Sequence, residues 1–188
     1  MSTLNNLNLY IMGQYFKACN VQTKECIISW DFNDNAKLME HSWNGNKFVN
    51  VAEKLLAKGG KWFGQPFCWS GDYAENEEGE SQNLYEISNE KAIKPKLGIY
   101  KKFRYLLNVT TKVFVDLEKV PVSSIYENYE YRIHALPLLT CEGNQRGGGD
   151  FYGEDPNNLV GSWARCIVEP TNIKPTAEFT ELIFDLKI

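Results

Sequence analysis

The feature that most constrains the fold is a short pattern that occurs twice along the chain. The segments YFKACNVQTKECIISWDF (residues 15–32) and YLLNVTTKVFVDLEKV (residues 105–120) share Asn-Val-x-Thr-Lys, and Asn20–Lys24 aligns with Asn108–Lys112 without a gap. In both copies apolar residues flank a short polar centre, which is typical of a β-hairpin with a tight turn. Two such hairpins predict two pseudo-repeated halves. Chance similarity between turns that draw on few residue types is an equally weighted alternative.

The rest of the chain predicts an α+β fold with a strand-rich mixed sheet and one clear amphipathic helix. Over residues 47–58 the apolar side chains recur at helical spacing, with Asn46 placed to cap the start and Gly59 to end it. A weaker helix is expected over residues 82–91. Strands are expected at FCWSG, at SWARCIV and at the C-terminal ELIFDLKI, where alternate residues are apolar.

Composition sets the class and the setting. The chain has 188 residues, of which 43% are hydrophobic, enough for a buried core in a single domain. No apolar run approaches the ~20 residues of a membrane span, and no signal peptide precedes the domain, so a cytoplasmic protein without membrane association is expected. A net charge of −4 argues against general nucleic-acid binding.

Charge is segregated along the chain. Residues 72–90 contain seven acidic and no basic side chains, whereas residues 91–104 contain six basic and no acidic ones. The default interpretation is two solvated, mutually neutralising segments. The alternative is an acidic surface that engages a basic protein partner.

The segment TCEGNQRGGGDFYGED (residues 140–155) is the leading candidate site. Consecutive glycines allow several backbone N–H groups to converge as an anion-binding nest, to which an arginine adds a bidentate fork. The predicted ligand-binding residues here are Asn144, Arg146, Gly147, Gly148, Gly149 and Asp150. The segment is neither a P-loop nor a dinucleotide fingerprint. A structural loop that passes closely over the sheet is an equally weighted alternative.

Two other segments carry candidates. In FCWSGDYAE, Trp69, Asp72 and Tyr73 suit a stacked base or sugar at a strand end, or simply a strand that turns. In LMEHSWNGN, Glu40 and His41 suit acid–base catalysis, although a solvated turn is favoured. The catalytic candidates are therefore Glu40, His41, Asp72 and Asp150, and the metal-ligand candidates are Asp72, Asp150 and Glu154, with a divalent cation left open as cofactor.

Five cysteines without a Cys-x-x-Cys pair indicate reduced, buried thiols in a cytoplasmic chain. Cys141, immediately before the glycine segment, is the one retained as a candidate nucleophile. No nearby histidine supports that role.

From Met12 onward the chain resembles an uncharacterised family of bacterial and phage proteins. The segments that carry the resemblance are MGQYF, KLMEHS, WSGDYA, LPLLTCEGNQRGGGDF and GSWAR, with Phe16 where the family usually has tyrosine. The resemblance implies a prokaryotic or viral setting, a single domain over residues 12–188 and an N-terminal extension over residues 1–11. The repeated hairpin pattern, for its part, predicts half-repeats at residues 13–90 and 100–188. It implies no activity.

Three functions follow as hypotheses, and whether the protein is an enzyme is left open. The leading one is a domain that binds a small phosphorylated or nucleotide-like ligand through the glycine segment. The second is a phage-type anti-defence or immunity protein that acts by protein–protein binding. The third is a metal-assisted hydrolase.

Overall fold

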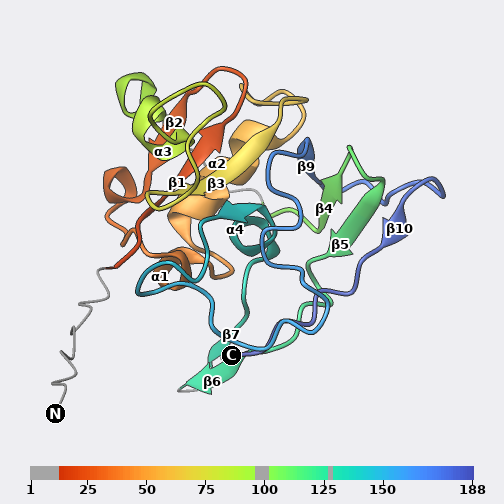
Figure 1. Ribbon diagram of the computed structural model, residues 1–188. Helices are drawn as coiled ribbons and strands as arrows, with labels where there is room; N and C mark the ends of the chain where they lie inside the picture. Colours follow the sequence, from red (N-terminus) through yellow and green to blue (C-terminus); the bar gives the residue numbers. More distant parts are fainter. Residues whose placement is uncertain (1–12, 96–101, 127–128) are drawn as a thin grey trace, which may run out of the picture.

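The computed structural model describes residues 13–95, 102–126 and 129–188. Within them, the strands form two four-stranded sheets, in the orders β2-β1-β3-β8 and β10-β5-β4-β9, and one two-stranded sheet, β6-β7 (Figure 1). The α+β class is thereby confirmed. The strands are β1 (Phe16–Asn20), β2 (Cys26–Ile28), β3 (Phe67–Gly71), β4 (Tyr105–Asn108), β5 (Val113–Asp116), β6 (Ser124–Tyr126), β7 (Tyr129–Tyr131), β8 (Cys141–Glu142), β9 (Val168–Thr171) and β10 (Thr180–Glu181).

The helices are short, with one exception. They are η1 (Ser29–Phe32), α1 (Leu38–His41), α2 (Lys47–Leu56), α3 (Leu84–Ile87), η2 (Ser88–Lys91) and α4 (Ala135–Thr140). The expected amphipathic helix is α2, and the Asn46 side chain caps it by accepting a hydrogen bond from Val49 N at 3.1 Å. The helix ends at Leu56 rather than at Lys58, before the left-handed Gly59. The weaker helix expected over residues 82–91 is the pair α3–η2.

Both expected hairpins form, and their turns share one construction. The side chains of Asn20 and Asn108 accept hydrogen bonds from the backbone N–H three residues on, at 2.9 Å and 3.0 Å. Lys24 and Lys112, which end the two turns, have left-handed φ angles of 61° and 59°. A short polar side chain that holds its own turn explains why asparagine opens both hairpins.

The similarity extends to a third strand in each sheet. β1 pairs antiparallel with β3, placing Asn20 opposite Phe67, and β4 pairs antiparallel with β9, placing Asn108 opposite Val168. The backbone N–H of the residue after each asparagine donates a hydrogen bond to the residue just before the third strand. These bonds run from Val21 N to Pro66 O at 2.9 Å and from Val109 N to Ile167 O at 2.8 Å. Pro66 and Ile167 in turn form an antiparallel bridge that joins the two sheets. The three-stranded units β2-β1-β3 and β5-β4-β9 therefore have the same strand order and the same register.

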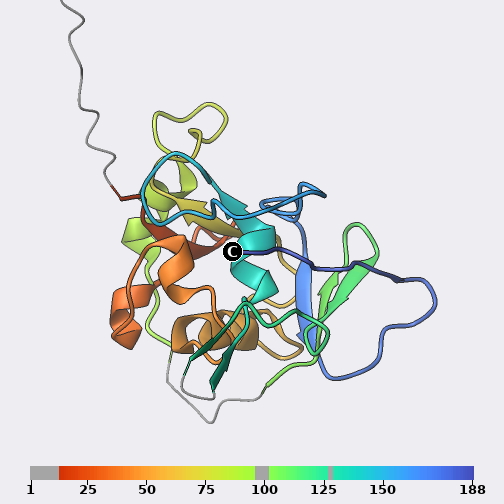
Figure 2. The ribbon, with the colours of Figure 1, turned by 90° about the horizontal axis from the view of Figure 1, so that it is seen from below.

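One hydrophobic core runs through both halves. The six residues of α4 are all buried, and both views place this helix between the two sheets (Figures 1 and 2). β8 directly follows α4 and pairs parallel with β3, so the second half of the chain completes the first sheet. On the side of α2, Phe48 packs against Trp69 with ring centroids 4.8 Å apart.

Two strand predictions were wrong. The C-terminal segment contributes only Thr180–Glu181 as a strand, because its later residues follow the core without a continuous ladder; Phe184 and Leu186 are buried but Ile188 is 66% exposed. The segment SWARCIV is mostly turn, and strand β9 begins only at its last residue, Val168. Arg165 lies in that turn with a left-handed φ of 65°.

Candidate functional site

The glycine segment closes over the start of β1. Gly148 O accepts a hydrogen bond from Gln14 N at 3.2 Å, and Gly149 O accepts one from Met39 N at 2.9 Å. The Arg146 guanidinium donates to Tyr73 O at 2.8 Å. The three segments singled out in the sequence therefore do meet in space. The glycine segment contacts the Met39 segment through a backbone hydrogen bond, and it contacts the Tyr73 segment through the Arg146 side chain and the pairing of β8 with β3.

The carboxylate of Asp150 occupies the nest that the glycine segment forms. Its Oδ2 accepts hydrogen bonds from Arg146 N at 3.1 Å and from Gly147 N at 3.2 Å, and the residue is only 3% exposed. Burial raises the pKa of Asp150 above its ordinary value, although these N–H donors act in the opposite direction. The converging backbone donors thus already bind an anion, and that anion is part of the loop itself.

The glycines are explained by the side chain of Gln14. A Cβ at Gly71, Gly143 or Gly147 would lie within 2.5 Å of an atom of this fully buried glutamine. Gly149 has a φ of 84°, a region that L-residues rarely adopt. Gly148 differs from both neighbours: unlike Gly149 it has no left-handed φ, and unlike at Gly147 a Cβ there would meet nothing closer than 3.6 Å. Within the run, Gly147 therefore lets the chain pass closely over Gln14, and Gly149 is favoured by its left-handed backbone and by the Lys37 side chain that lies against it.

Asn144 stabilises the same loop from its other end. Its Oδ1 accepts from Phe151 N at 3.0 Å, and its Nδ2 donates to Phe151 O at 3.3 Å. The Asn144 side chain thus gives the backbone N–H and C=O of Phe151 the hydrogen bonds that a neighbouring strand would otherwise form with them. The amide oxygen and the amide nitrogen of Asn144 therefore both form hydrogen bonds within the loop.

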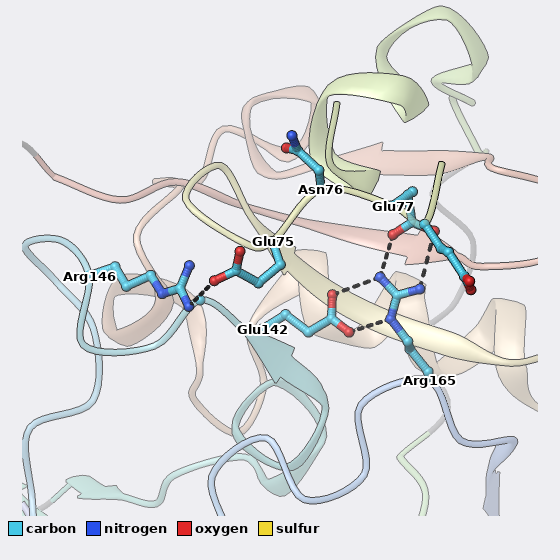
Figure 3. A pocket seen from close by; sticks show the side chains of 8 residues that line it. Glu75, Asn76, Glu77, Glu142, Arg146 and Arg165 are labelled. Carbon is cyan, nitrogen blue, oxygen red and sulfur yellow. Dashed lines mark hydrogen bonds and ion pairs between the residues drawn. The ribbon is translucent and has the colours of Figure 1, made fainter. Parts of the chain in front are cut away.

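A pocket of about 400 Å³ lies beside this loop, and its lining is acidic. Figure 3 shows its charged groups, which come from the loop after β3, from β8, from the glycine segment (Arg146) and from the turn before β9. The lining residues are Glu75, Asn76, Glu77, Glu78, Glu142, Gly143, Arg146 and Arg165.

The two arginines of the pocket are held by its carboxylates. Arg165 lies between Glu77 and Glu142 and donates to both, and Arg146 Nη2 lies 2.6 Å from Glu75 Oε1 (Figure 3). Arg165 is the main cause that lowers the pKa of Glu77 to about 2. Four glutamates against two paired arginines leave the pocket with an excess of negative charge.

His41 is a core residue. Its ring is 0% exposed, its Nε2 accepts from Trp69 Nε1 at 2.8 Å, and its Nδ1 lies 3.1 Å from Asn35 O. Because an indole N–H only donates, Nε2 is unprotonated and the ring proton resides on Nδ1. Burial lowers the pKa of His41 to about 4. Both ring nitrogens of His41 therefore have hydrogen-bond partners within the core, which corrects the prediction that His41 is an acid–base catalyst.

Trp69 and Glu40 also have structural positions. Trp69 is 0% exposed and presents no ring face on which a ligand could stack, so that prediction was wrong. Glu40 is exposed and accepts from Lys37 N at 3.1 Å, which completes the capping of α1.

The remaining acidic candidates are dispersed. Asp72 Oδ1 accepts from Tyr15 N at 3.1 Å at the end of β3, and burial raises its pKa. Glu154 is exposed, and its backbone bonds to that of Lys187 near the C-terminus. Among residues 13–95, 102–126 and 129–188, no three His, Cys, Asp or Glu side chains are grouped so as to hold a metal ion. Cys141 is buried and donates to Leu138 O at 3.4 Å, and burial raises the pKa of its thiol, as expected for a structural cysteine.

Sequence reasoning did not place Gln14, Glu77 or Arg165 at a site. A lone buried glutamine carries no sequence signal, because its role depends on three glycines that lie far from it in the chain. Glu77 was visible only as one of seven acids, and Arg165 was assigned to a strand.

The chain matches no protein-family model, no curated protein and no solved structure. The resemblance to bacterial and phage proteins therefore stays a prediction. In the part of the chain that the structure describes, no helix combines the length and the apolar character needed to cross a bilayer.

Proposed function

We propose that this protein is a binding module whose ordered acidic surface recognises a basic segment of a partner protein. The observation that carries the proposal is the acidic segment over residues 72–90. Cations from elsewhere in the chain hold it against the body of the protein, while several of its carboxylates face outward.

The anchors of this segment come from three other parts of the chain. Glu77 pairs with Lys24 at 3.0 Å and with Arg165, and Glu75 pairs with Arg146. At its base the Asn83 side chain donates to Asp72 O at 3.0 Å and to Ala74 O at 3.2 Å. A loop that is already ordered loses less conformational entropy when a partner binds.

The outward carboxylates supply the charge for recognition. Within the described residues Glu78, Glu80 and Glu90 are exposed and form no salt bridge. A phosphate group would meet repulsion at the adjacent pocket, whereas a guanidinium or ammonium group would meet attraction.

An exposed aromatic pair adjoins this surface. Tyr15 and Trp30 are 39% and 55% exposed and pack edge-to-face with ring centroids 5.8 Å apart. Tyr15 connects to the acidic segment through the hydrogen bond from its N–H to Asp72. Tyrosine and tryptophan are enriched where proteins bind one another, so the pair extends the surface by a group suited to a protein partner.

The test measures binding of a fluorescein-labelled hexapeptide of alternating lysine and arginine by fluorescence anisotropy. We expect binding that weakens as salt rises, and at least a tenfold loss in the triple variant Glu78→Gln, Glu80→Gln, Glu90→Gln. All three side chains are exposed, so the fold is expected to stay intact.

The matched control removes the same charge elsewhere. The triple variant Glu130→Gln, Glu154→Gln, Glu178→Gln also changes three exposed glutamates. If both triple variants weaken peptide binding equally, the attraction reflects only net charge, and the acidic segment is not a recognition surface.

A further inference from the structure

Three cysteines lie side by side on three adjacent strands of the first sheet. Cys19 on β1 is directly opposite Cys26 on β2 and directly opposite Cys68 on β3. All three are free and 0% exposed, and they form a small cluster with Leu84 on the sheet face that α3 and η2 cover. Cys19 and Cys26 are not among the residues that line the pocket, whereas Cys68 interacts with Glu142, which is.

The hydrogen-bond pattern of the sheet distinguishes the two pairs. Asn20 N donates to Glu25 O at 2.8 Å, so the neighbouring pair Cys19–Cys26 is a non-hydrogen-bonded pair. On the other side of β1, Val21 N donates to Pro66 O, which makes Cys19–Cys68 a hydrogen-bonded pair. Non-hydrogen-bonded partners have Cα atoms ~4.5 Å apart and closer side chains, against ~5.5 Å in the other kind of pair.

Both distances fall within the Cα range of disulfides, about 4.4–6.8 Å, but the short Cβ separation that the bond needs favours the non-hydrogen-bonded pair. The thiols of Cys19 and Cys26 also share one neighbour. Cys26 Sγ donates to Ser88 O at 3.3 Å, and Cys19 Sγ lies 3.6 Å from Ser88 Oγ.

The thiols of Cys19 and Cys26 differ in acidity, as expected of a pair in which one thiol is the nucleophile of an oxidation. The hydrogen bond with Cys19 is the largest of the causes that lower the pKa of Cys26 to about 7, and Ser88 and the Lys17 ammonium lower it further. Burial raises the pKa of Cys19 and of Cys68. Cys26 is therefore the thiol most readily deprotonated near neutral pH, and thiolates are the nucleophiles in thiol oxidation.

We propose that Cys19 and Cys26 form a reversible, peroxide-driven cross-strand disulfide. The Cys26 thiolate attacks one oxygen of hydrogen peroxide, forming a sulfenic acid and releasing hydroxide. The Cys19 sulfur then displaces the sulfenic oxygen, which leaves as water once the Cys19 proton is transferred. Two thiols and one peroxide thus give one disulfide and two waters, and two electrons pass from sulfur to peroxide.

Peroxide reaches the pair when the covering segment opens. α3 and η2 span only four residues each, and such short elements open at a lower free energy than the core. The disulfide removes the thiol hydrogen bond to Ser88 O, so oxidation loosens η2. The inference does not depend on the proposed function, because it rests on the strand register and on thiol chemistry.

The test treats the native full-length chain with hydrogen peroxide, blocks remaining thiols with N-ethylmaleimide in guanidinium, and maps tryptic peptides by mass spectrometry. Cleavage after Lys17, Lys24 and Lys37 separates Cys19 (residues 18–24) from Cys26 (residues 25–37), so their disulfide joins two peptides. We expect that joined species, a fall from five free thiols to three, and five free thiols again in a parallel sample that is reduced with dithiothreitol and desalted before the blocking step.

The matched variants are Cys68→Ser and Cys26→Ser. The first should form the same disulfide, and the second should keep all of its four remaining thiols under the same treatment. A peptide that joins Cys19 to Cys68 in the wild type, or five free thiols after treatment, overturns the proposal. Far-UV circular dichroism of both variants checks that they are folded.

Discussion

Replacing Asp150 by alanine tests whether the Asp150 side chain fills the anion-binding nest of the glycine segment or whether that nest is open to an external anion. Asp150 accepts hydrogen bonds from two backbone N–H groups, those of Arg146 and Gly147, and is 3% exposed. In Asp150→Ala these donors lose their acceptor inside the protein, and each buried, unsatisfied group costs about 1–3 kcal/mol.

Taking about 1.5 kcal/mol for each of the two donors, Asp150→Ala should lower the free energy of unfolding by about 3 kcal/mol. For a chain of this size, about 2–4 °C of melting temperature corresponds to 1 kcal/mol, so Tm should fall by about 6–12 °C. Asp150→Asn keeps one oxygen that can accept from both donors and should lose less than half as much. Urea unfolding followed by tryptophan fluorescence measures all three proteins.

Formate provides the second arm of the same experiment, because it has the shape and charge of the removed carboxylate. If the nest is vacated in Asp150→Ala, formate should raise the Tm of the variant and leave that of the wild type unchanged. A wild type that inorganic phosphate stabilises, or an Asp150→Ala protein as stable as the wild type, would refute the conclusion that Asp150 fills the nest.

Three further predictions test the packing around the site. Gly147→Ala should destabilise the protein, because its Cβ would lie 2.6 Å from Gln14 N, whereas Gly148→Ala should be near neutral in thermal melts. Burial lowers the pKa of His41 from 6.5 to about 4, so the unfolded chain binds the proton more tightly; about 3 kcal/mol of stability should be lost as pH falls from about 6.5 to about 4, and urea titrations of His41→Gln should show a smaller loss. His134 Nε2 lies 3.2 Å from Glu53 Oε1 and both side chains are buried, so His134→Ala removes the polar neighbour of a buried carboxyl group and should lower the free energy of unfolding in urea by about 1–3 kcal/mol.

The fold elements that the sequence predicted correctly are those that local interactions determine. Each hairpin turn is made by an asparagine that bonds to its own backbone and by a lysine in the left-handed region. The capping of α2 by Asn46 joins residues only three apart. We also predict that deleting residues 1–11 leaves the fold intact. These residues lie outside the part of the chain that the structure describes.

The errors concern segments whose conformation depends on distant partners. The alternating C-terminal residues were predicted to form a strand, but they pair with β5 only through Thr180 and Glu181, although β5 itself continues to Asp116. Arg165 lies in a turn whose shape follows from its pairing with Glu77 and Glu142, which are 88 and 23 residues away. Neither the strand pairing of the C-terminal segment nor the ion pairs of Arg165 can be predicted from the residues next to them in the sequence.

By itself the sequence determined the hairpins, the main helix, the α+β class and the existence of a special loop at residues 143–153. Only the tertiary structure decided how that loop is built. Whether a row of glycines binds an external anion depends on what occupies its N–H groups, and here Asp150 does. Whether an acidic segment is a loose, solvated stretch or an ordered surface depends on cations from distant residues, and here Lys24, Arg146 and Arg165 provide them. Both answers lie in contacts between segments far apart in the chain, and composition and spacing do not encode such contacts locally.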